Sequence, residues 1–208
     1  MLVKFVEITP HAERMVAYCA RVSSSHQNKE EYAQLIRYCI KHGHWSVFEQ
    51  AFMTVEIETA RAITAQILRH RSFTFQEFSQ RYSEPSGVEM NTARAQGKSN
   101  RQVGDGNVPE WISDEWNRVQ EQIYTICFDE YQRMIELGIA RECARYILPM
   151  ATKSRLYMCG SVRSWIHYIQ LREKPDTQKE HRDIVLAVKE IFKDKLPTTA
   201  EALGWGRE

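Results

Sequence analysis

The sequence predicts a single α+β domain in which a mixed or antiparallel sheet packs against several long helices. Some short segments alternate apolar and polar residues with the period of a strand, and longer segments repeat apolar residues every three or four positions. No internal repeat or low-complexity tract separates them. At 208 residues, 43% of them hydrophobic, the chain is long enough to bury one substantial core. Residues 1–208 are therefore expected to form one domain.

Three segments predict the strands. Leu2–Ile8 alternates loosely before Thr9-Pro10, Val47–Glu58 alternates clearly, and Ser154–Cys159 is a short third segment. The apolar face of the middle segment consists of Val47, Ala51, Met53, Val55 and Ile57. Glu49 falls in that apolar register, where an ionised carboxylate needs a partner or a ligand unless it reaches solvent at the beginning of the strand.

Helical spacing of apolar residues predicts the helices, several of which end at a glycine or a proline. They are expected at residues 11–21, 30–42, 60–70, 111–137, 141–148, 161–172 and 176–195. The longest carries one apolar stripe, which is expected to face the core. The stripe consists of Trp116, Val119, Ile123, Ile126, Cys127, Tyr131 and Met134. Residues 93–109 hold three glycines and few apolar side chains, and are expected to form an exposed loop.

The helix expected at residues 161–172 carries polar groups on two sides. Ser161 is suited to cap its beginning. Arg163, His167 and Gln170 share one side, whereas Arg172 points nearly the opposite way, because nine steps of about 100° bring it half a turn round from Arg163. The two polar sides are therefore expected to meet two different environments.

Opposite charges nearly cancel, with 28 Lys and Arg against 27 Asp and Glu. The chain lacks an overall basic field, so no nucleic-acid partner is expected. Five widely spaced cysteines without a C-x-x-C pair are typical of buried free thiols in a reducing compartment. Residues 1–10 lack a signal-peptide pattern and no apolar run reaches the length of a membrane span, so a cytoplasmic protein with no membrane partner is expected.

The segment Arg69–Arg81 gathers three arginines, a histidine and three phenylalanines. Guanidinium groups suit phosphate or carboxylate, and aromatic rings beside them suit a flat ligand such as a nucleobase. A solvated helix terminus, whose arginines favour the negative end of the helix dipole, explains the same residues equally well. Gln66, Arg69 and His70 stand at positions i, i+3 and i+4 and share one helical face, a polar corner suited to reading a base edge.

Other common site patterns are absent or incomplete. No P-loop, H-E-x-x-H or G-x-S-x-G motif occurs. His42-x-His44 lies near Cys39, but no fourth ligand has a zinc-like spacing, so no metal site is expected. Ser79 cannot be paired with a base and an acid from sequence, and a hydroxyl that hydrogen-bonds substrate is the simpler interpretation.

The Arg69–Arg81 segment resembles the signature of the flavin-dependent thymidylate synthases, the ThyX family. That signature has Arg-His-Arg, a serine three residues later, Asn-Glu, a serine and an arginine. This chain has Arg69-His70-Arg71, Thr74, Gln76-Glu77, Ser79 and Arg81, so Thr74 and Gln76 are conservative departures. The resemblance continues in order through Ala20–Ser23, Lys41–His44, Phe48-Glu49, Ala144–Pro149, Leu171-Arg172 and Gln178–Glu180.

This resemblance implies the reductive methylation of dUMP to dTMP. Methylenetetrahydrofolate would supply the carbon, and FAD reduced by NADPH would supply the hydride. The family's enzymes are homotetramers whose active sites are shared between subunits, so the same assembly is expected. The resemblance also implies that Glu77–Arg81 reach the nucleotide of a neighbouring subunit.

The resemblance also implies site residues. The positions that match dUMP contacts are Gln66, Ile67, Leu68, Arg69, Glu77, Phe78, Ser79, Gln80, Arg81, Arg145 and Arg172. The positions that match FAD contacts are Ser23, His44, Ser46, Glu49, Arg69, His70, Arg71, Ser161, Val162, Arg163 and His167. The family often has asparagine where Ser161 and His167 stand, and a histidine near Asp176, so this chain departs from the family pattern at its flavin contacts.

Arg172 matches the catalytic position of the family. The C5 atom of a pyrimidine attacks an electrophilic carbon more readily once N3 has lost its proton, and a fixed guanidinium stabilises that anion. Such activation needs no enzyme thiol, which is consistent with cysteines that lack an activating context. Two other classes remain open: a nucleic-acid-binding module that stacks bases on the phenylalanines, and a flavoprotein that keeps FAD without turnover.

Overall fold

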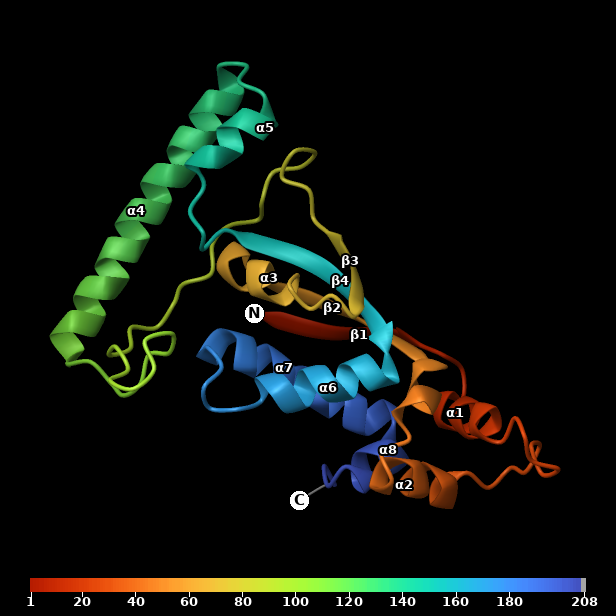
Figure 1. The fold of residues 1–208 in the computed structure, drawn as a ribbon. Helices are drawn as coiled ribbons and strands as arrows, with labels where there is room; N and C mark the ends of the chain where they lie inside the picture. Colours follow the sequence, from red (N-terminus) through yellow and green to blue (C-terminus); the bar gives the residue numbers. More distant parts are fainter. Residues whose placement is uncertain (207–208) are drawn as a thin grey trace.

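A computed structural model describes residues 1–206 and contains a four-stranded antiparallel sheet with helices packed around it (Figure 1). The strands are β1 (Leu2–Ile8), β2 (Phe52–Ala60), β3 (Phe73–Glu77) and β4 (Lys153–Ser161). Their order is β1-β2-β4-β3, and Val55 of β2 lies opposite Met158 of β4 at the centre. This arrangement confirms the expected α+β class.

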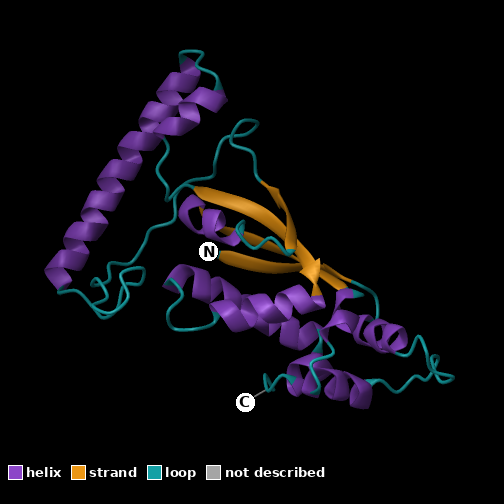
Figure 2. Ribbon diagram, viewed as in Figure 1, coloured by secondary structure: helices purple, strands orange, loops and turns teal. Residues whose placement is uncertain are grey.

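The helices gather mainly on one face and at one end of the sheet (Figure 2). They are α1 (Ala12–Ala20), α2 (Ala33–Lys41), α3 (Arg61–Ile67), α4 (Glu110–Glu136), α5 (Arg141–Ala144), α6 (Val162–Arg172), α7 (Lys179–Lys195) and α8 (Pro197–Ala202), with short 3-10 helices η1 (Trp45–Glu49) and η2 (Arg145–Ile147). None of the helices formed by residues 1–206 is long and apolar enough to cross a lipid bilayer.

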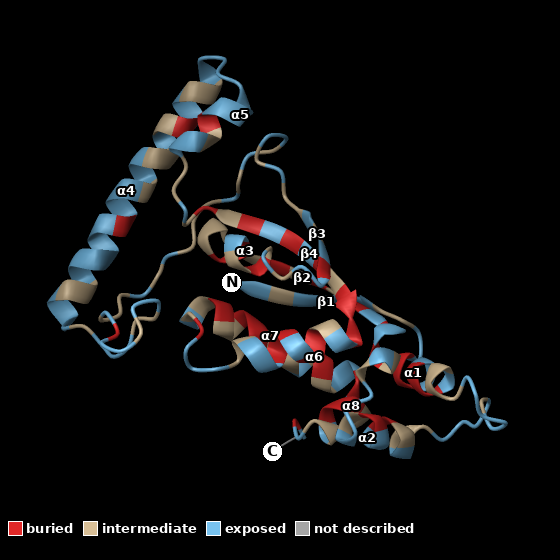
Figure 3. Ribbon diagram, in the orientation of Figure 1, coloured by how far each residue is buried: buried red, intermediate tan, exposed pale blue. Residues whose placement is uncertain are grey.

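The hydrophobic core lies between the central strands and the pair α6 and α7 (Figure 3). Trp165 and Ile169 of α6 and Ile184 of α7 are fully buried, as are Val55 and Met158 of the sheet. Removing this apolar surface from water is the main force that holds α6 in place. The core therefore fixes the helix whose two polar sides the sequence singles out.

Helix α4 differs from the prediction. It stands apart from the sheet (Figure 1), and its main contacts are with α5 and η2. Tyr131 is buried, but Trp116, Ile123 and Ile126 are 40%, 48% and 52% exposed. The expectation that this stripe faces the core of the chain is therefore wrong, because helical spacing shows that a face is apolar but not what covers it.

Two further boundaries differ near the expected site. The middle strand begins at Phe52 rather than at Val47, because residues 45–49 form η1. Glu49 consequently lies on an exposed 3-10 turn and not in an apolar strand register. Strand β3, at one edge of the sheet, was not predicted, although Phe73 and Phe75 alternate with polar residues as in a half-buried strand.

Smaller differences lie toward the C-terminal half. Residues 141–147 form α5 followed by η2 rather than one helix, and the last long helix begins at Lys179 rather than at residue 176. That helix ends at Lys195, just before Pro197, as expected, and Pro197 then begins the further short helix α8, where a missing N–H costs nothing. All five cysteines are free as expected, but only Cys39 is buried; Cys143 is exposed, and the other three are partly exposed.

The expected loop is confirmed. Residues 93–109 contain no helix or strand, and only an isolated bridge pairs Gln96 with Gly104. The loop is nevertheless tied to the body, since Arg94 donates to Glu180 of α7 across 2.9 Å. Asn91 donates to the same carboxylate across 2.8 Å. These contacts hold the beginning of the loop against the N-terminal end of α7.

Candidate functional site

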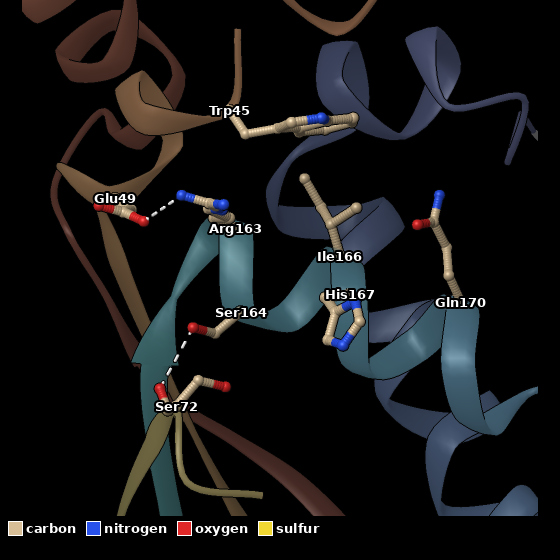
Figure 4. Close-up of a pocket in the computed structure, with 8 residues that line it drawn as sticks. All are labelled: Trp45, Glu49, Ser72, Arg163, Ser164, Ile166, His167 and Gln170. Atoms are coloured by element: carbon tan, nitrogen blue, oxygen red, sulfur yellow. Dashed lines mark hydrogen bonds and ion pairs between the residues drawn. The ribbon is translucent and has the colours of Figure 1, made fainter. Parts of the chain in front are cut away.

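Helix α6 begins at a capped turn and opens onto a pocket (Figure 4). Strand β4 leads directly into this helix, and the Ser161 hydroxyl accepts a hydrogen bond from the Ser164 N–H across 3.2 Å. The pocket has a volume of about 550 Å³, within the range of small-molecule sites. Its lining consists of Trp45, Glu49, Ser72, Arg163, Ser164, Ile166, His167 and Gln170.

An ion pair crosses one side of this pocket. Arg163 donates to Glu49 of η1 across 2.5 Å (Figure 4), and each of the two side chains is 49% exposed. Solvent screens a pair this exposed, so it adds little to stability. The pair can therefore open to accept an anionic or polar ligand with little loss of folding free energy.

The pocket confirms one geometric prediction. Arg163, His167 and Gln170 all line it from the same side of α6, as the helical spacing indicates. Trp45 faces them from η1, and Ser72 accepts a hydrogen bond from Ser164 across 3.2 Å. A flat aromatic side chain, hydroxyls and a cation thus meet in one cavity.

Arg172 lies on the other side of α6, beside the end of the Arg-His-Arg segment. Its Nε donates to Nε2 of His70 across 3.1 Å. Burial and the neighbouring Arg172 guanidinium lower the pKa of His70 to about 4. The imidazole is therefore neutral near pH 7, and it can accept this hydrogen bond.

The Gln66 side chain is joined to the beginning of helix α7. Its amide nitrogen donates to Gln178 across 2.6 Å, and its oxygen lies 3.3 Å from Nδ1 of His181. His70 packs edge-on against Tyr168 with ring centroids 4.8 Å apart. Gln66 and His70 therefore turn toward α6 and α7, whereas Arg69 is exposed.

A second pocket, of about 350 Å³, lies at the beginning of α3 and brings three polar residues together. Arg61, Gln80 and Arg145 line it with Tyr146, Leu148, Pro149 and Met150. The Gln80 Nε2 is buried without a hydrogen-bond partner among residues 1–206. A buried amide of this kind is costly unless a ligand or water completes it.

Glu77 stands beside this second pocket and is held within the chain. It pairs with Arg61 and accepts a hydrogen bond from the Ser154 hydroxyl across 2.8 Å. Arg81 extends toward Glu142 at 3.8 Å. The expected nucleotide contacts thus fall into two groups within one chain, one around Gln66 and one around Gln80.

Known proteins share this chain's sequence over nearly its whole length. Residues 4–198 match the Thy1 family, described as thymidylate synthase complementing protein. A probable flavin-dependent thymidylate synthase of Paramecium bursaria Chlorella virus 1 is 48% identical over 203 residues, covering 96% of this chain and 94% of the relative. A flavin-dependent thymidylate synthase of Synechocystis is 50% identical over 193 residues, covering 93% and 90%. The chain belongs to the flavin-dependent thymidylate synthase family.

Solved structures agree with this family assignment. A UMP/dUMP methylase, PolB from Streptomyces cacaoi, bound with 5-Br dUMP, superposes with a TM-score of 0.84 at 28% identity, covering 99% of this chain and 95% of that chain. The same methylase bound with 5-Br UMP gives 0.85 at 29% identity, with 99% and 94% covered. The fold expected from the thymidylate synthase resemblance is therefore confirmed.

The first pocket gathers only part of the expected flavin set. Glu49, Arg163 and His167 line it. Ser161 instead caps α6, and Val162 is fully buried with its N–H donating to the Ala51 carbonyl across 2.9 Å. The expected positions outside the lining are Ser23, His44, Ser46, Arg69, His70 and Arg71.

The expected nucleotide set is similarly divided. Gln66 and Arg172 lie on the His70 side of α6, and Gln80 and Arg145 line the second pocket. Ile67 is fully buried in the core. Phe78 lines a separate small pocket of about 200 Å³ together with Glu58 and Arg155. Leu68, Ser79 and Arg81 line neither the first nor the second pocket.

Several lining residues were not predicted as site residues. They are Trp45, Ser72, Ser164, Ile166 and Gln170 in the first pocket, and Arg61, Tyr146, Leu148, Pro149 and Met150 in the second. Helical spacing was a usable signal for Ile166 and Gln170, which stand three and seven positions after Arg163 on one helix. No spacing relates Trp45 or Arg61 to their distant partners. Among residues 1–206, no group of three or more His, Cys, Asp or Glu is arranged to hold a metal ion.

Proposed function

We propose that the protein catalyses the reductive methylation of dUMP to dTMP, with methylenetetrahydrofolate as carbon donor and FAD reduced by NADPH as hydride donor. The observation that carries this proposal is the arrangement of α6. One side of this helix presents Arg163 and His167 to the first pocket, and the other presents Arg172 beside His70. The proposed cofactor pocket and the proposed catalytic arginine therefore lie on opposite sides of one helix.

The first pocket fits a flavin. Trp45 and Ile166 offer flat apolar surface, and Arg163 and Ser164 offer donors to polar or phosphate oxygens. Its volume of about 550 Å³ suits one segment of FAD rather than the whole molecule. When bound, the flavin supplies the hydride, while the protein binds, orients and shields it.

Arg172 is proposed to stabilise the pyrimidine anion formed when N3 loses its proton. Its Nε is taken by His70, so the guanidinium plane is fixed and its terminal amino groups are available to the base. The low pKa of His70, about 4, keeps the imidazole neutral, so it does not repel the arginine. Fixing the cation in advance lowers the cost of reorganisation in the transition state.

Arg145 and Arg81 are proposed to hold the nucleotide phosphate. Arg145 lines the second pocket together with Gln80, whose buried Nε2 has no partner within residues 1–206. Arginine binds phosphate through two parallel N–H donors, which orients the ligand as well as attracting it. The ion pair of Glu77 with Arg61 then helps to hold the Ser79–Arg81 turn in position.

The active unit is proposed to be a homotetramer. The uncovered side of α4 suits contact with further copies of the chain, since Ile123 and Ile126 remain about half exposed. In a shared site, the Gln80 group of one subunit would meet the Gln66 group of another. The division of the expected nucleotide residues within one chain supports that arrangement.

The visible spectrum of the purified protein tests the proposal. A flavin spectrum that changes when dUMP is added, together with dTMP formation from dUMP, methylenetetrahydrofolate and NADPH, is expected. NADPH oxidation without dTMP would identify a flavoprotein of another function. Absence of any yellow chromophore, combined with salt-sensitive binding of nucleic acid, would contradict the proposal outright.

A further inference from the structure

A chain of buried and partly buried hydrogen bonds runs from α6 to the beginning of α7. The Tyr168 hydroxyl lies 3.0 Å from Nε2 of His181, and Nδ1 of His181 lies 3.3 Å from the Gln66 oxygen. The Gln66 nitrogen donates to Gln178 across 2.6 Å, and Gln178 donates to Glu180 across 2.9 Å. Tyr168 and His181 are both fully buried. These five residues are called the α6–α7 chain below.

Glu180 sets the direction of the α6–α7 chain. Burial raises the pKa of Glu180, but hydrogen bonds from its own backbone N–H, from Gln178 and from Arg94 outweigh burial and leave the pKa below its usual value. An ionised carboxylate only accepts hydrogen bonds. The Gln178 nitrogen must therefore face Glu180, and the Gln178 oxygen must face Gln66.

That direction passes to the histidine. With its nitrogen facing Gln178, Gln66 turns its oxygen toward Nδ1 of His181. Nδ1 then carries the proton, so Nε2 is an acceptor and the Tyr168 hydroxyl is its donor. Burial raises the pKa of Tyr168, so this hydroxyl keeps its proton. Burial also lowers the pKa of His181 to about 3, which keeps the ring neutral.

We propose that His181 is a positioning residue: its Nδ1–H holds the Gln66 amide, for the nucleotide, in the orientation that Glu180 and Gln178 set. The inference rests on the proposed function, in which Gln66 contacts dUMP. An amide has two N–H donors and two acceptor positions, and the α6–α7 chain uses one of each. The remaining donor and acceptor of Gln66 therefore have a fixed order. The edge of a base has its own fixed donors and acceptors, so it can pair with the amide in only one orientation. A reversed Gln66 amide would place its oxygen against an acceptor of the base and its N–H against a donor.

Two substitutions separate positioning from packing. Asn places its amide nitrogen near the position of Nδ1, and Gln places its amide group near the position of Nε2. His181→Asn therefore keeps the donor to Gln66, whereas His181→Gln keeps a partner for Tyr168 and loses that donor. For His181→Gln we expect the KM for dUMP to rise about tenfold, the size of one lost hydrogen bond, with kcat changed by less than about threefold.

The conservative variant provides the rescue. His181→Asn is expected to return the KM for dUMP to within about threefold of wild type. Equal KM values in His181→Gln and wild type would overturn the positioning role. Equal losses in His181→Gln and His181→Asn, with equal falls in thermal unfolding midpoint, would assign the residue to packing alone and overturn the role as well.

A second pair of variants tests the direction of the hydrogen bonds in the α6–α7 chain. Glu180→Gln replaces a carboxylate that only accepts hydrogen bonds by an amide that can also donate them. The Gln178 amide is then no longer held in one orientation, so the KM for dUMP is expected to rise as in His181→Gln. Asp183→Asn is the matched control, since Asp183 lies on the same helix and pairs only with Lys179 at 2.5 Å among residues 1–206. An unchanged KM in Glu180→Gln would contradict the proposal.

These measurements also separate the inference from the proposed function. Wild-type protein that forms no dTMP would contradict the proposed function itself. If the wild type is active, and Gln66→Ala raises the KM for dUMP but His181→Gln does not, the proposed function stands and only the role of His181 is contradicted. Active wild type in which Gln66→Ala leaves the KM unchanged would also overturn it, because there would be no contact to position.

Discussion

Nε of Arg172 donates a hydrogen bond to Nε2 of His70 across 3.1 Å, although 102 positions separate the two residues. The bond joins the end of α6 to the turn after α3, two segments that the core holds together. It fixes the plane of the guanidinium without using its terminal amino groups. Since the pKa of His70 is lowered to about 4, the partner remains an acceptor at neutral pH.

Substitution of Arg172 is expected to remove the chemistry and spare the flavin. Arg172→Ala should lower kcat for dTMP formation by about 10²–10³ or more, the loss seen when one preorganised donor is removed from developing charge. Bound flavin, measured by visible absorbance, should stay near the wild-type level because Arg172 lies outside the first pocket. Arg37→Ala, which removes a surface arginine paired with Glu201, is the control. Full activity in Arg172→Ala would refute the assigned role.

Substitution of Arg163 is expected to weaken flavin binding. Arg163→Ala removes the cation that lines the first pocket, so the dissociation constant for FAD should rise about tenfold or more, as when a charge-assisted hydrogen bond is lost. Fluorescence titration of the flavin-free protein with FAD measures it. The thermal unfolding midpoint of the flavin-free protein should change little, since the Arg163–Glu49 pair is half exposed. Wild-type FAD affinity in Arg163→Ala would move the flavin site elsewhere.

A charge on the exposed side of α4 is expected to break the assembly. Ile123 is 48% exposed within one chain, so Ile123→Glu costs the isolated subunit little but places a carboxylate in the proposed interface. Light scattering after size-exclusion chromatography should show smaller species, approaching the 24.4 kDa of one chain. Thr125→Glu adds the same charge on another side of the same helix, and it should leave the mass unchanged. A tetramer in both variants would place the interface on another surface.

Stability should fall as the pH is lowered below about 6.5. His181 has an ordinary pKa of 6.5 when unfolded and about 3 when folded, so the unfolded chain binds the proton more readily. Its contribution to stability is complete above pH 6.5 and is lost as the pH falls toward 3. Between pH 7 and pH 5 the loss is about 2 kcal/mol in the free energy of unfolding. The nearby Arg172 and His70 act in the same direction as burial.

Denaturant unfolding at several pH values, at one protein concentration, measures this dependence. His181→Asn carries no titrating ring, so its free energy of unfolding should fall less steeply over the same range. His70 should contribute a similar but smaller effect, because it is only partly buried. Parallel curves for wild type and His181→Asn would show that the ring titrates alike in the folded and unfolded chain.

Loss of the Arg94 contact is expected to loosen the loop at residues 93–109. Arg94 reaches Glu180 to within 2.6 Å, and both side chains are only 19% exposed. Arg94→Ala should therefore increase the rate of limited proteolysis by subtilisin within the loop by several-fold, because local opening becomes more frequent. Arg101→Ala changes an exposed arginine of the same loop and serves as the control. Equal cleavage rates would mean that other contacts hold the loop.

Local sequence pattern predicted α6 better than any other part of the candidate site. The spacing of Arg163, His167 and Gln170 gave their common side, and the cap at Ser161 gave the beginning of the helix. Both features depend only on helix geometry, so they need no knowledge of the remaining fold. The opposite direction of Arg172 followed from the same geometry.

Contacts between distant segments could not be predicted in this way. No spacing relates Tyr168 and His181 to Gln66, because the core decides how α3, α6 and α7 meet. Strand β3 has only five residues, and the arginines before it obscured the alternation of Phe73 and Phe75. The stripe on α4 was predicted correctly as apolar and wrongly as internal, since a pattern does not name its partner.

The uncovered side of α4 has a consequence for how the protein responds to dilution. Within one chain this helix of 27 residues rests mainly on the short segments α5 and η2. Under the proposed assembly, part of the free energy that keeps it folded comes from other molecules. Folding and association then become one equilibrium, and the temperature at which the protein unfolds should rise with its concentration. The protein's stability is in that case a property of the solution as much as of the chain.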